Sequence, residues 1–138
     1  MEWKLEVVSI PVTDLDRARD FYAEKIGFNV DIDHSANDFR FLQLTPHGSG
    51  CSIHLRKASD ERPAGVIKDL FLVVADVRAA RDYLVERGVD AGDVQVFDSG
   101  KYRPARQGES LDMVGCVLFS DPDGNSWTVQ QIPPRDTE

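Results

Sequence analysis

The stretch "PVTDLDRARDFYAEKIGF", Pro11 to Phe28, returns in altered form as "VADVRAARDYLVERGV", Val74 to Val89. With Asp14 aligned to Asp76, the two copies share an Asp, an apolar stripe and an Ala-Arg-Asp core. An Asp before an apolar stripe is typical of a helix N-cap, and a Gly after it is typical of the left-handed residue that ends a helix. The repeat therefore predicts two amphipathic helices of about three turns each.

Strand-like segments surround both predicted helices in the same order. An apolar strand precedes each helix, at residues 5–12 and 69–76. The segments "FNVDID", "FRFLQLT" and "CSIHLRK" follow the first helix, and "VQVFD", "CVLFS" and "SWTVQQI" follow the second. This order predicts an α+β fold of two βαβββ half-repeats that form a curved mixed sheet around a central cavity.

The segment "ASDERPAG", residues 58–65, is polar, contains Pro and Gly, and separates the two half-repeats as a linker. We expect a single domain over residues 1–138, with half-repeat 1 at about 1–58 and half-repeat 2 at about 66–133.

Composition and charge narrow the range of partners. The 138 residues include 16 Lys or Arg and 24 Asp or Glu, a formal net charge of −8. This charge would repel a phosphate backbone, so we expect no nucleic-acid partner. No apolar run reaches the ~20 residues of a membrane span and no signal segment opens the chain, so we expect a cytoplasmic protein with no membrane partner. Cys51 and Cys116 lie in apolar, strand-like surroundings and are expected to be reduced core residues.

The alternation within each strand predicts which residues line the cavity. If Ile10 and Val12 pack on the first helix, then Val7 and Ser9 face away from it. Applied to the last strand of each half, the same rule turns polar and apolar groups toward the cavity, a mixture typical of small-molecule pockets. The predicted ligand-binding residues on strands are Val7, Ser9, Ser52, His54, Leu70, Leu72, Thr128 and Gln130.

A long irregular stretch, "DSGKYRPARQGESLDMVG", occupies residues 98–115. Loops longer than about 12 to 15 residues are usually functional or mobile. Tyr102 and Arg103 in this stretch are further candidates for ligand contact, since Arg binds carboxylates and stacks on rings. The alternative interpretation is a solvated loop without a binding role.

The paired half-repeats, the segment "VTDLDRARDFYAEKIGF" and the closing "FSDPDGNSWTV" together resemble the vicinal oxygen chelate superfamily. This superfamily contains glyoxalase I, bleomycin-resistance-type drug-binding proteins, extradiol dioxygenases and fosfomycin-resistance enzymes. The resemblance covers nearly the whole chain and implies the paired βαβββ fold and a homodimer. It implies much less about chemistry, because one fold hosts many reactions and some pure binders.

In metal-dependent members of that superfamily, the first and last strands of each half provide the metal ligands. The resemblance places these positions at Val7, His54, Leu70 and Thr128. Val and Leu have no lone pair and Thr is a poor ligand, so we expect no metal cofactor; the alternative is a divalent ion such as Zn, Ni, Mn or Fe held by displaced ligands. His54 is expected to be an interior residue or pocket liner, and it is the candidate general base if the protein is an enzyme.

Three functions remain open. The first is a metal-free protein that binds a small, aromatic or drug-like molecule. The second is a lyase, isomerase or dioxygenase, either metal-dependent through displaced ligands or metal-independent through His54. The third is a regulatory module that senses a metabolite. The missing ligand set favours the first function over a glyoxalase I activity and leaves open whether the protein is an enzyme.

Overall fold

The computed structural model describes residues 1–134, and the chain divides into two compact units. The first unit contains Met1–Ile67 together with Asp121–Asn125, and the second contains Lys68–Ser120 and residues 126–134. Each unit has its own sheet, so the predicted half-repeats and the α+β class are confirmed, with one mixed sheet per half. No helix among residues 1–134 is long and apolar enough to cross a membrane.

The first unit has a four-stranded sheet in the order β1-β4-β3-β2. β1 runs parallel to β4, while β4 with β3 and β3 with β2 are antiparallel. Its helical segment continues from an α-helix directly into a π-helix. The elements are β1 (Val7–Val12), α1 (Leu15–Arg19), η1 (Asp20–Ile26), β2 (Asn29–Ala36), β3 (Phe39–Thr45) and β4 (Ser52–Lys57).

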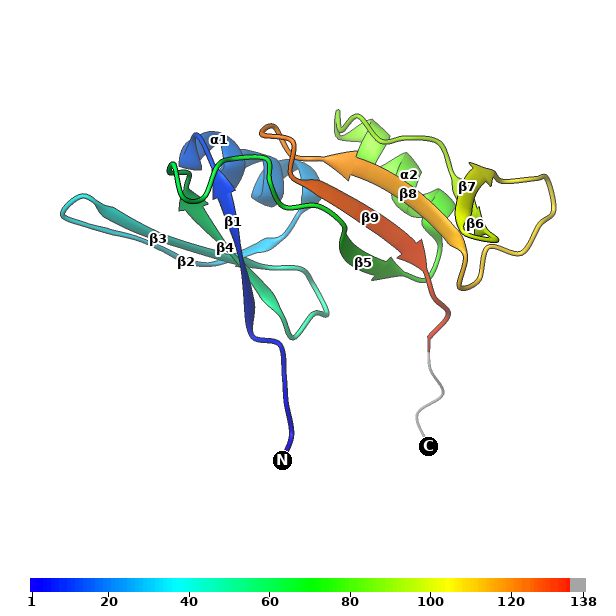
Figure 1. Cartoon of the computed structure of the whole chain (residues 1–138), viewed down its shortest axis with the longest axis horizontal. Helices are drawn as coiled ribbons and strands as arrows, with labels where there is room; N and C mark the ends of the chain where they lie inside the picture. Colours follow the sequence, from blue (N-terminus) through cyan, green and yellow to red (C-terminus); the bar gives the residue numbers. More distant parts are fainter. Residues whose placement is uncertain (135–138) are drawn as a thin grey trace. The chain divides into compact units, whose positions relative to one another are not determined.

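The second unit repeats the pattern with a five-stranded sheet in the order β5-β9-β8-β6-β7. β5 runs parallel to β9, and the other neighbouring pairs are antiparallel. Figure 1 labels the strands of both sheets along the chain. The elements are β5 (Leu70–Val74), α2 (Val77–Glu86), β6 (Gln95–Asp98), β7 (Lys101–Pro104), β8 (Gly115–Ser120) and β9 (Ser126–Gln131).

The predicted helix boundaries are confirmed. The Asp14 side chain accepts a 3.1 Å hydrogen bond from the Arg17 N–H, and Asp76 caps α2 in the same way. Gly27 ends η1 in the left-handed conformation, with φ at 93°, where a side chain would be strained. The Gly27 and Phe28 amides both donate to the Tyr22 carbonyl oxygen, which closes the wide last turn.

The segment 98–115 is more ordered than predicted. Its start forms a hairpin between β6 and β7, with Asp98 paired to Lys101. The two turn residues, Ser99 and Gly100, have φ of 53° and 85°. A two-residue turn with positive φ at both positions suits the twist of a hairpin, and a Ser-Gly pair between strand-like segments is the signal that predicts it.

The core of each unit lies between its sheet and its helix. In the first unit, Ile10, Val12, Leu42, Leu44 and Leu55 are fully buried. In the second unit, α2 contributes Val77 and Leu84, and the sheet contributes residues that include Val117, Phe119, Trp127 and Val129. Each sheet therefore covers its helix with one face, and the opposite face is available for function.

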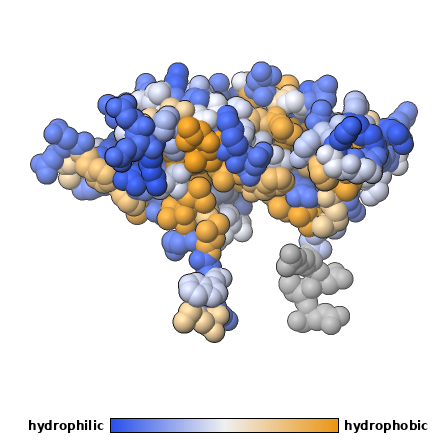
Figure 2. Space-filling model, viewed as in Figure 1, coloured by the Kyte–Doolittle hydropathy of each residue, from blue (hydrophilic) through white to orange (hydrophobic). Residues whose placement is uncertain are grey.

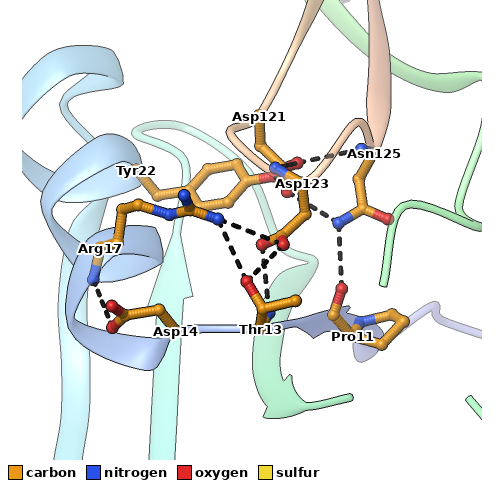
Figure 3. A network of polar contacts seen from close by, with 8 residues as sticks. All are labelled: Pro11, Thr13, Asp14, Arg17, Tyr22, Asp121, Asp123 and Asn125. Atoms are coloured by element: carbon orange, nitrogen blue, oxygen red, sulfur yellow. Dashed lines mark hydrogen bonds and ion pairs between the residues drawn. The ribbon is translucent and has the colours of Figure 1, made fainter. Parts of the chain in front are cut away.

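The turn between β8 and β9, residues 121–125, joins the first unit through a buried polar network (Figure 3). The Asp121 carboxylate accepts hydrogen bonds from the Tyr22 hydroxyl, at 2.8 Å, and from the Asn125 amide, at 2.8 Å. The Asn125 amide also donates to the Pro11 carbonyl oxygen, at 3.1 Å. Because Asp121 and Asn125 are buried, these bonds are needed to satisfy them.

A more exposed set of contacts extends this network. The Thr13 hydroxyl donates to Asp123 at 2.7 Å, and Arg17 lies 3.3 Å from the same carboxylate. The network thus connects the end of β1, α1 and η1 with the turn at residues 121–125. Thr13 and Asp123, which it joins, are 110 residues apart in the sequence.

Candidate functional site

The sheet face turned away from α1 and η1 carries four of the predicted ligand-binding residues. Val7 is paired with Ser52 and Ser9 with His54 in the parallel register of β1 and β4. Paired residues of a parallel ladder lie on the same face, so the strand alternation is as predicted in this half. We call the side chains of Val7, Ser9, Ile32, Phe41, Gln43 and His54 on this surface the His54 face.

His54 lies at the centre of this face. Its imidazole stacks at a tilt on Phe41, with ring centroids 4.3 Å apart, and Gln43 is its neighbour on β3. Nε2 is buried and has no hydrogen-bond partner among residues 1–134. Burial, together with the nearby Arg56 cation, holds the pKa of His54 below its usual range. The ring is therefore held neutral, and its Nε2 is a buried polar atom whose hydrogen-bonding capacity the described residues leave unused.

Two exposed apolar side chains share this face with His54. Val7 is 39% exposed and Ile32 is 42% exposed, although both have large side chains. Figure 2 shows hydrophobic residues reaching the surface among hydrophilic ones. A neutral imidazole and an amide among apolar groups form a surface that suits a flat organic molecule with one or two polar atoms.

Ser52, predicted to bind ligand, is buried in a local hydrogen-bond chain. Its hydroxyl lies 2.6 Å from the hydroxyl of Thr45, and Thr45 in turn donates to the Asp31 carboxylate. Since Thr45 has only one hydroxyl proton and gives it to Asp31, Ser52 must donate to Thr45. The bond from Thr45 lowers the pKa of Asp31. Ser52 therefore connects β3 and β4 and offers at most an acceptor oxygen to a ligand.

The second sheet corrects the face predicted for two residues. Leu70 is paired with Trp127 and Leu72 with Val129, so both leucines lie on the face that packs on α2. Phe71 and Val73 lie instead beside Thr128 and Gln130 on the open face. The prediction placed Leu70 and Val7 at matching positions, but they stand at different distances from their helix caps. A shift of one residue moves a strand's side chains to the opposite face.

The open face of the second sheet is more apolar than predicted. The strand registers place five large apolar side chains on it, and each is between 39% and 58% exposed. Four of these residues were not among the predicted site residues. Strand alternation could have identified them, because it places their side chains on the same face as Thr128 and Gln130. The five are Phe71, Val73, Phe97, Tyr102 and Leu118.

Thr128 and Gln130 offer few polar atoms on this face to which a ligand could bind. Thr128 is 3% exposed, and the Gln130 amide donates a 2.7 Å hydrogen bond to the Met113 carbonyl oxygen. The Gln130 bond anchors the end of the 98–115 segment to β9.

Tyr102 and Arg103 point to different roles within β7. Tyr102 packs edge to face on Phe97, with centroids 5.2 Å apart, and belongs to the apolar face. The Arg103 guanidinium donates a 2.9 Å hydrogen bond to the Asp98 carboxylate. It also donates to both carboxylate oxygens of Glu109, at 2.9 Å and 2.5 Å. The Arg103 bonds lower the pKa of Glu109 to about 2. The guanidinium thus holds the loop together.

The residues at the four positions implied by the family do not fit a divalent metal. His54 is the only nitrogen donor among them, Val7 and Leu70 have no donor atom, and Thr128 is buried in its sheet. Among residues 1–134, no three His, Cys, Asp or Glu side chains are grouped so that they could hold a metal ion. A catalytic divalent ion requires several such donors at about 2.0 to 2.2 Å.

Comparison with known proteins assigns the fold to one superfamily. A family model described as "Glyoxalase/Bleomycin resistance protein/Dioxygenase superfamily" matches residues 4–129. Curated proteins gave no match.

Three solved structures illustrate the likeness. TnmS3, an antibiotic binding protein from Streptomyces sp. CB03234, is 31% identical over 95% of this chain and 97% of its own, with a TM-score of 0.74. A glyoxalase/bleomycin resistance protein from the same Streptomyces is 32% identical over 93% and 100%, with a TM-score of 0.71. A superfamily member from Sphaerobacter thermophilus is 25% identical over 94% and 98%, with a TM-score of 0.70.

Proposed function

Since the chain belongs to the glyoxalase/bleomycin resistance protein/dioxygenase superfamily, we propose that it binds a small, ring-containing organic molecule without a metal. One similar structure, at 31% identity, is that of an antibiotic binding protein. A drug-like or antibiotic ligand is the corresponding expectation for this chain.

The observation that carries the proposal is the pair formed by His54 and Phe41. The two rings lie 4.3 Å apart on an open sheet face, and the buried Nε2 of His54 has no partner among residues 1–134. A planar ligand can stack on these rings and take one hydrogen bond from or to the imidazole. Val7 and Ile32 provide apolar area beside them.

His54 also supports a second candidate function. A neutral imidazole that lacks a hydrogen-bond partner can accept a proton from a bound substrate, so a metal-independent isomerase or lyase would use His54 as its general base. The loss of turnover in His54→Gln with retained ligand binding would distinguish this enzyme from a pure binder.

The ligand proposal is tested by a thermal-shift screen of aromatic natural products, including antibiotics, followed by calorimetry. A ligand present at a hundred times its Kd should stabilise the fold by about 2.7 kcal/mol. Phe41→Leu should weaken binding of any hit at least fivefold, because it removes the stacking ring. Tyr83→Leu is the control, since Tyr83 is 40% exposed and lies on α2 in the second unit, outside the His54 face.

Metal addition provides the opposing test. Zn, Ni, Mn or Fe salts added to the purified protein should leave the calorimetric baseline and the thermal midpoint unchanged. Stoichiometric metal binding that is lost in His54→Gln would overturn the proposal of a metal-free binder.

We also propose that the protein is a homodimer, as the family resemblance implies. Sedimentation equilibrium at micromolar concentration tests this, and a monomer at every concentration would contradict it.

A further inference from the structure

The end of the first sheet contains a cavity that the proposed function does not use. Its volume is about 440 Å³ and it lies wholly within the first unit. The start of α1, the start of β3 and the end of β4 provide its walls. The lining residues are Leu15, Asp38, Phe39, Arg40, Arg56 and Lys57.

Two cations in this cavity have no counter-ion. Arg56 and Lys57 are both exposed, and neither forms an ion pair or a side-chain hydrogen bond among residues 1–134. Arg40 is different, because it binds Asp16 at 2.6 Å and Asp33 at 2.9 Å. The ion pairs with Asp16 and Asp33 neutralise the charge of Arg40. The two cations Arg56 and Lys57 then outnumber the one remaining carboxylate, Asp38, so the cavity has an excess of positive charge.

This local excess of positive charge contrasts with the formal net charge of the whole chain, which is −8. Two adjacent cations without a carboxylate partner give the cavity a positive potential that attracts an anion from solution. The positive charge also reaches His54, since Arg56 contributes to the low pKa of that imidazole.

An aromatic wall accompanies the charge. Phe39 lines the cavity, is 54% exposed, and lies 6.5 Å from Phe41 between ring centroids. Leu15 adds apolar surface from α1. An exposed ring beside Arg and Lys side chains matches a ligand that has a flat apolar body and an anionic end.

A cavity of similar size in the second unit provides an internal contrast. It has a volume of about 380 Å³ and contains Arg78 and Arg81 together with Asp82 and Asp93. Arg81 binds Asp93 at 3.2 Å, no aromatic ring lines this cavity, and its charges balance. The same reasoning therefore predicts no anion site there.

We propose that the cavity lined by Phe39, Arg56 and Lys57 binds a small aryl carboxylate. The carboxylate pairs with the guanidinium of Arg56, and the ring lies against Phe39, whose strand register places it on the same face of the sheet as Arg56. Lys57, the next residue of β4, adds positive charge at the end of the strand. Arg is suited to a planar carboxylate because its N–H groups can donate two parallel hydrogen bonds. The inference does not rest on the proposed function, because its ligand contacts Phe39 and Arg56 rather than the rings of Phe41 and His54.

The test uses the full chain and three probes: 1-naphthoate, its neutral amide 1-naphthamide, and inorganic phosphate. Calorimetry should give binding of naphthoate that is about tenfold tighter than that of naphthamide, as one charge-assisted hydrogen bond would cause. Phosphate should bind more weakly than naphthoate because it has no ring. Added salt should weaken naphthoate binding.

Variants identify the site. Arg56→Gln should weaken naphthoate binding about tenfold, and Lys57→Gln should weaken it by a smaller factor. Arg78→Gln removes the same charge from the balanced cavity and should leave the affinity unchanged. Both residues of the site are exposed, so neither variant should disturb folding, which circular dichroism will verify.

Three results would overturn the inference. They are equal affinity for naphthoate and naphthamide, an unchanged affinity in Arg56→Gln, and phosphate binding as tight as naphthoate binding. A failed screen for ligands of the His54 face would leave the result of this experiment intact, because the probes and variants differ.

Discussion

The hydroxyl of Tyr22 donates a 2.8 Å hydrogen bond to the carboxylate of Asp121, and both side chains are buried. The bond connects η1 to the turn between β8 and β9. The same carboxylate also accepts from the backbone amides of Asp123 and Asn125, each at 2.9 Å. A buried carboxylate needs hydrogen-bond donors to satisfy its oxygens, so each of these donors matters.

Tyr22→Phe should destabilise the protein. The change removes only the hydroxyl, so the apolar packing of the ring remains while Asp121 loses one donor. Loss of a hydrogen bond to a charged, buried group costs about 1.5 to 3 kcal/mol of unfolding free energy. Urea denaturation followed by circular dichroism measures this loss.

Tyr102→Phe is the matched control for the Tyr22 prediction. Tyr102 is 43% exposed, and its hydroxyl forms no hydrogen bond among residues 1–134. Its variant should change the unfolding free energy by less than about 0.5 kcal/mol. Equal losses in the two variants would contradict the role assigned to the bond between Tyr22 and Asp121.

Gly65→Ala should be more destabilising than Gly48→Ala. Both glycines have φ near 80°, so both variants carry the cost of about 1 kcal/mol for a left-handed alanine. A Cβ at Gly65 would also lie 2.4 Å from the Asp123 carbonyl oxygen, while a Cβ at Gly48 would meet no atom within 4 Å.

Urea denaturation of the two Gly variants separates these costs. The loss at Gly48 measures the backbone conformation alone, and the excess at Gly65 measures the close approach of the linker to the turn at 121–125. Similar losses at both positions would show that the linker does not pack against this turn in solution.

The carboxyl of Glu109 should titrate far below its ordinary value of 4.5. Hydrogen bonds from Arg103, and one from the backbone N–H of Arg106, lower its pKa to about 2. The charged form is favoured in the folded state, so its contribution to stability is complete above pH 4.5 and is lost as the pH falls from 4.5 toward 2. Carbon-detected NMR of the side-chain carboxyl reports this titration directly.

Arg103→Met should return the pKa of Glu109 toward 4.5, because it removes the largest cause of the shift. Arg78→Met, on α2, removes an arginine that is not among the groups acting on the Glu109 carboxyl and should leave the titration unchanged. A pKa near 4.5 in the unaltered protein would show that the loop is not held by Arg103.

The imidazole of His54 should titrate below 6.5. Burial and the Arg56 cation disfavour its charged form, while its other neighbours on the face, Ser9 and Gln43, are uncharged, and His34 is exposed on β2. The folded state therefore holds fewer protons than the unfolded state in this range. The stability contributed by neutral His54 is complete above pH 6.5 and is lost as the pH falls through the lowered pKa.

Arg56→Gln should raise the pKa of His54 toward 6.5, as measured by NMR of the imidazole carbons. Lys25→Gln, on η1, removes an exposed charge that does not act on His54 and serves as the control. An unchanged His54 pKa in Arg56→Gln would mean that the Arg56 cation lies too far from the ring to act on it.

Local patterns predicted much of the fold. The Asp caps and the closing glycines act within a few residues, so the helix boundaries are readable from the chain alone, as Asp14 and Gly27 illustrate. The alternation of β1 and β4 likewise placed Ser9 and His54 on one face, because a strand's side chains reverse direction at every residue.

The candidate site was less readable. Leu70 and Leu72 were assigned to the wrong face, because alternation gives the two sets of side chains but not which set meets the helix. That choice follows from the pairing of β5 with β9, two strands that are distant in sequence. The same reason explains why the predicted site left out Phe71, Val73, Phe97 and Leu118.

The sequence by itself determined the two half-repeats and the helix caps. Only the tertiary structure decided that the turn at 121–125 belongs with Tyr22 and Pro11 in the first unit, and that Arg56 and Lys57 share a cavity with Phe39. The physical reason is distance along the chain. Helix caps and strand alternation depend on residues that are near in sequence. The partners of a buried carboxylate, and the surroundings of an unpaired cation, are residues that only folding brings close.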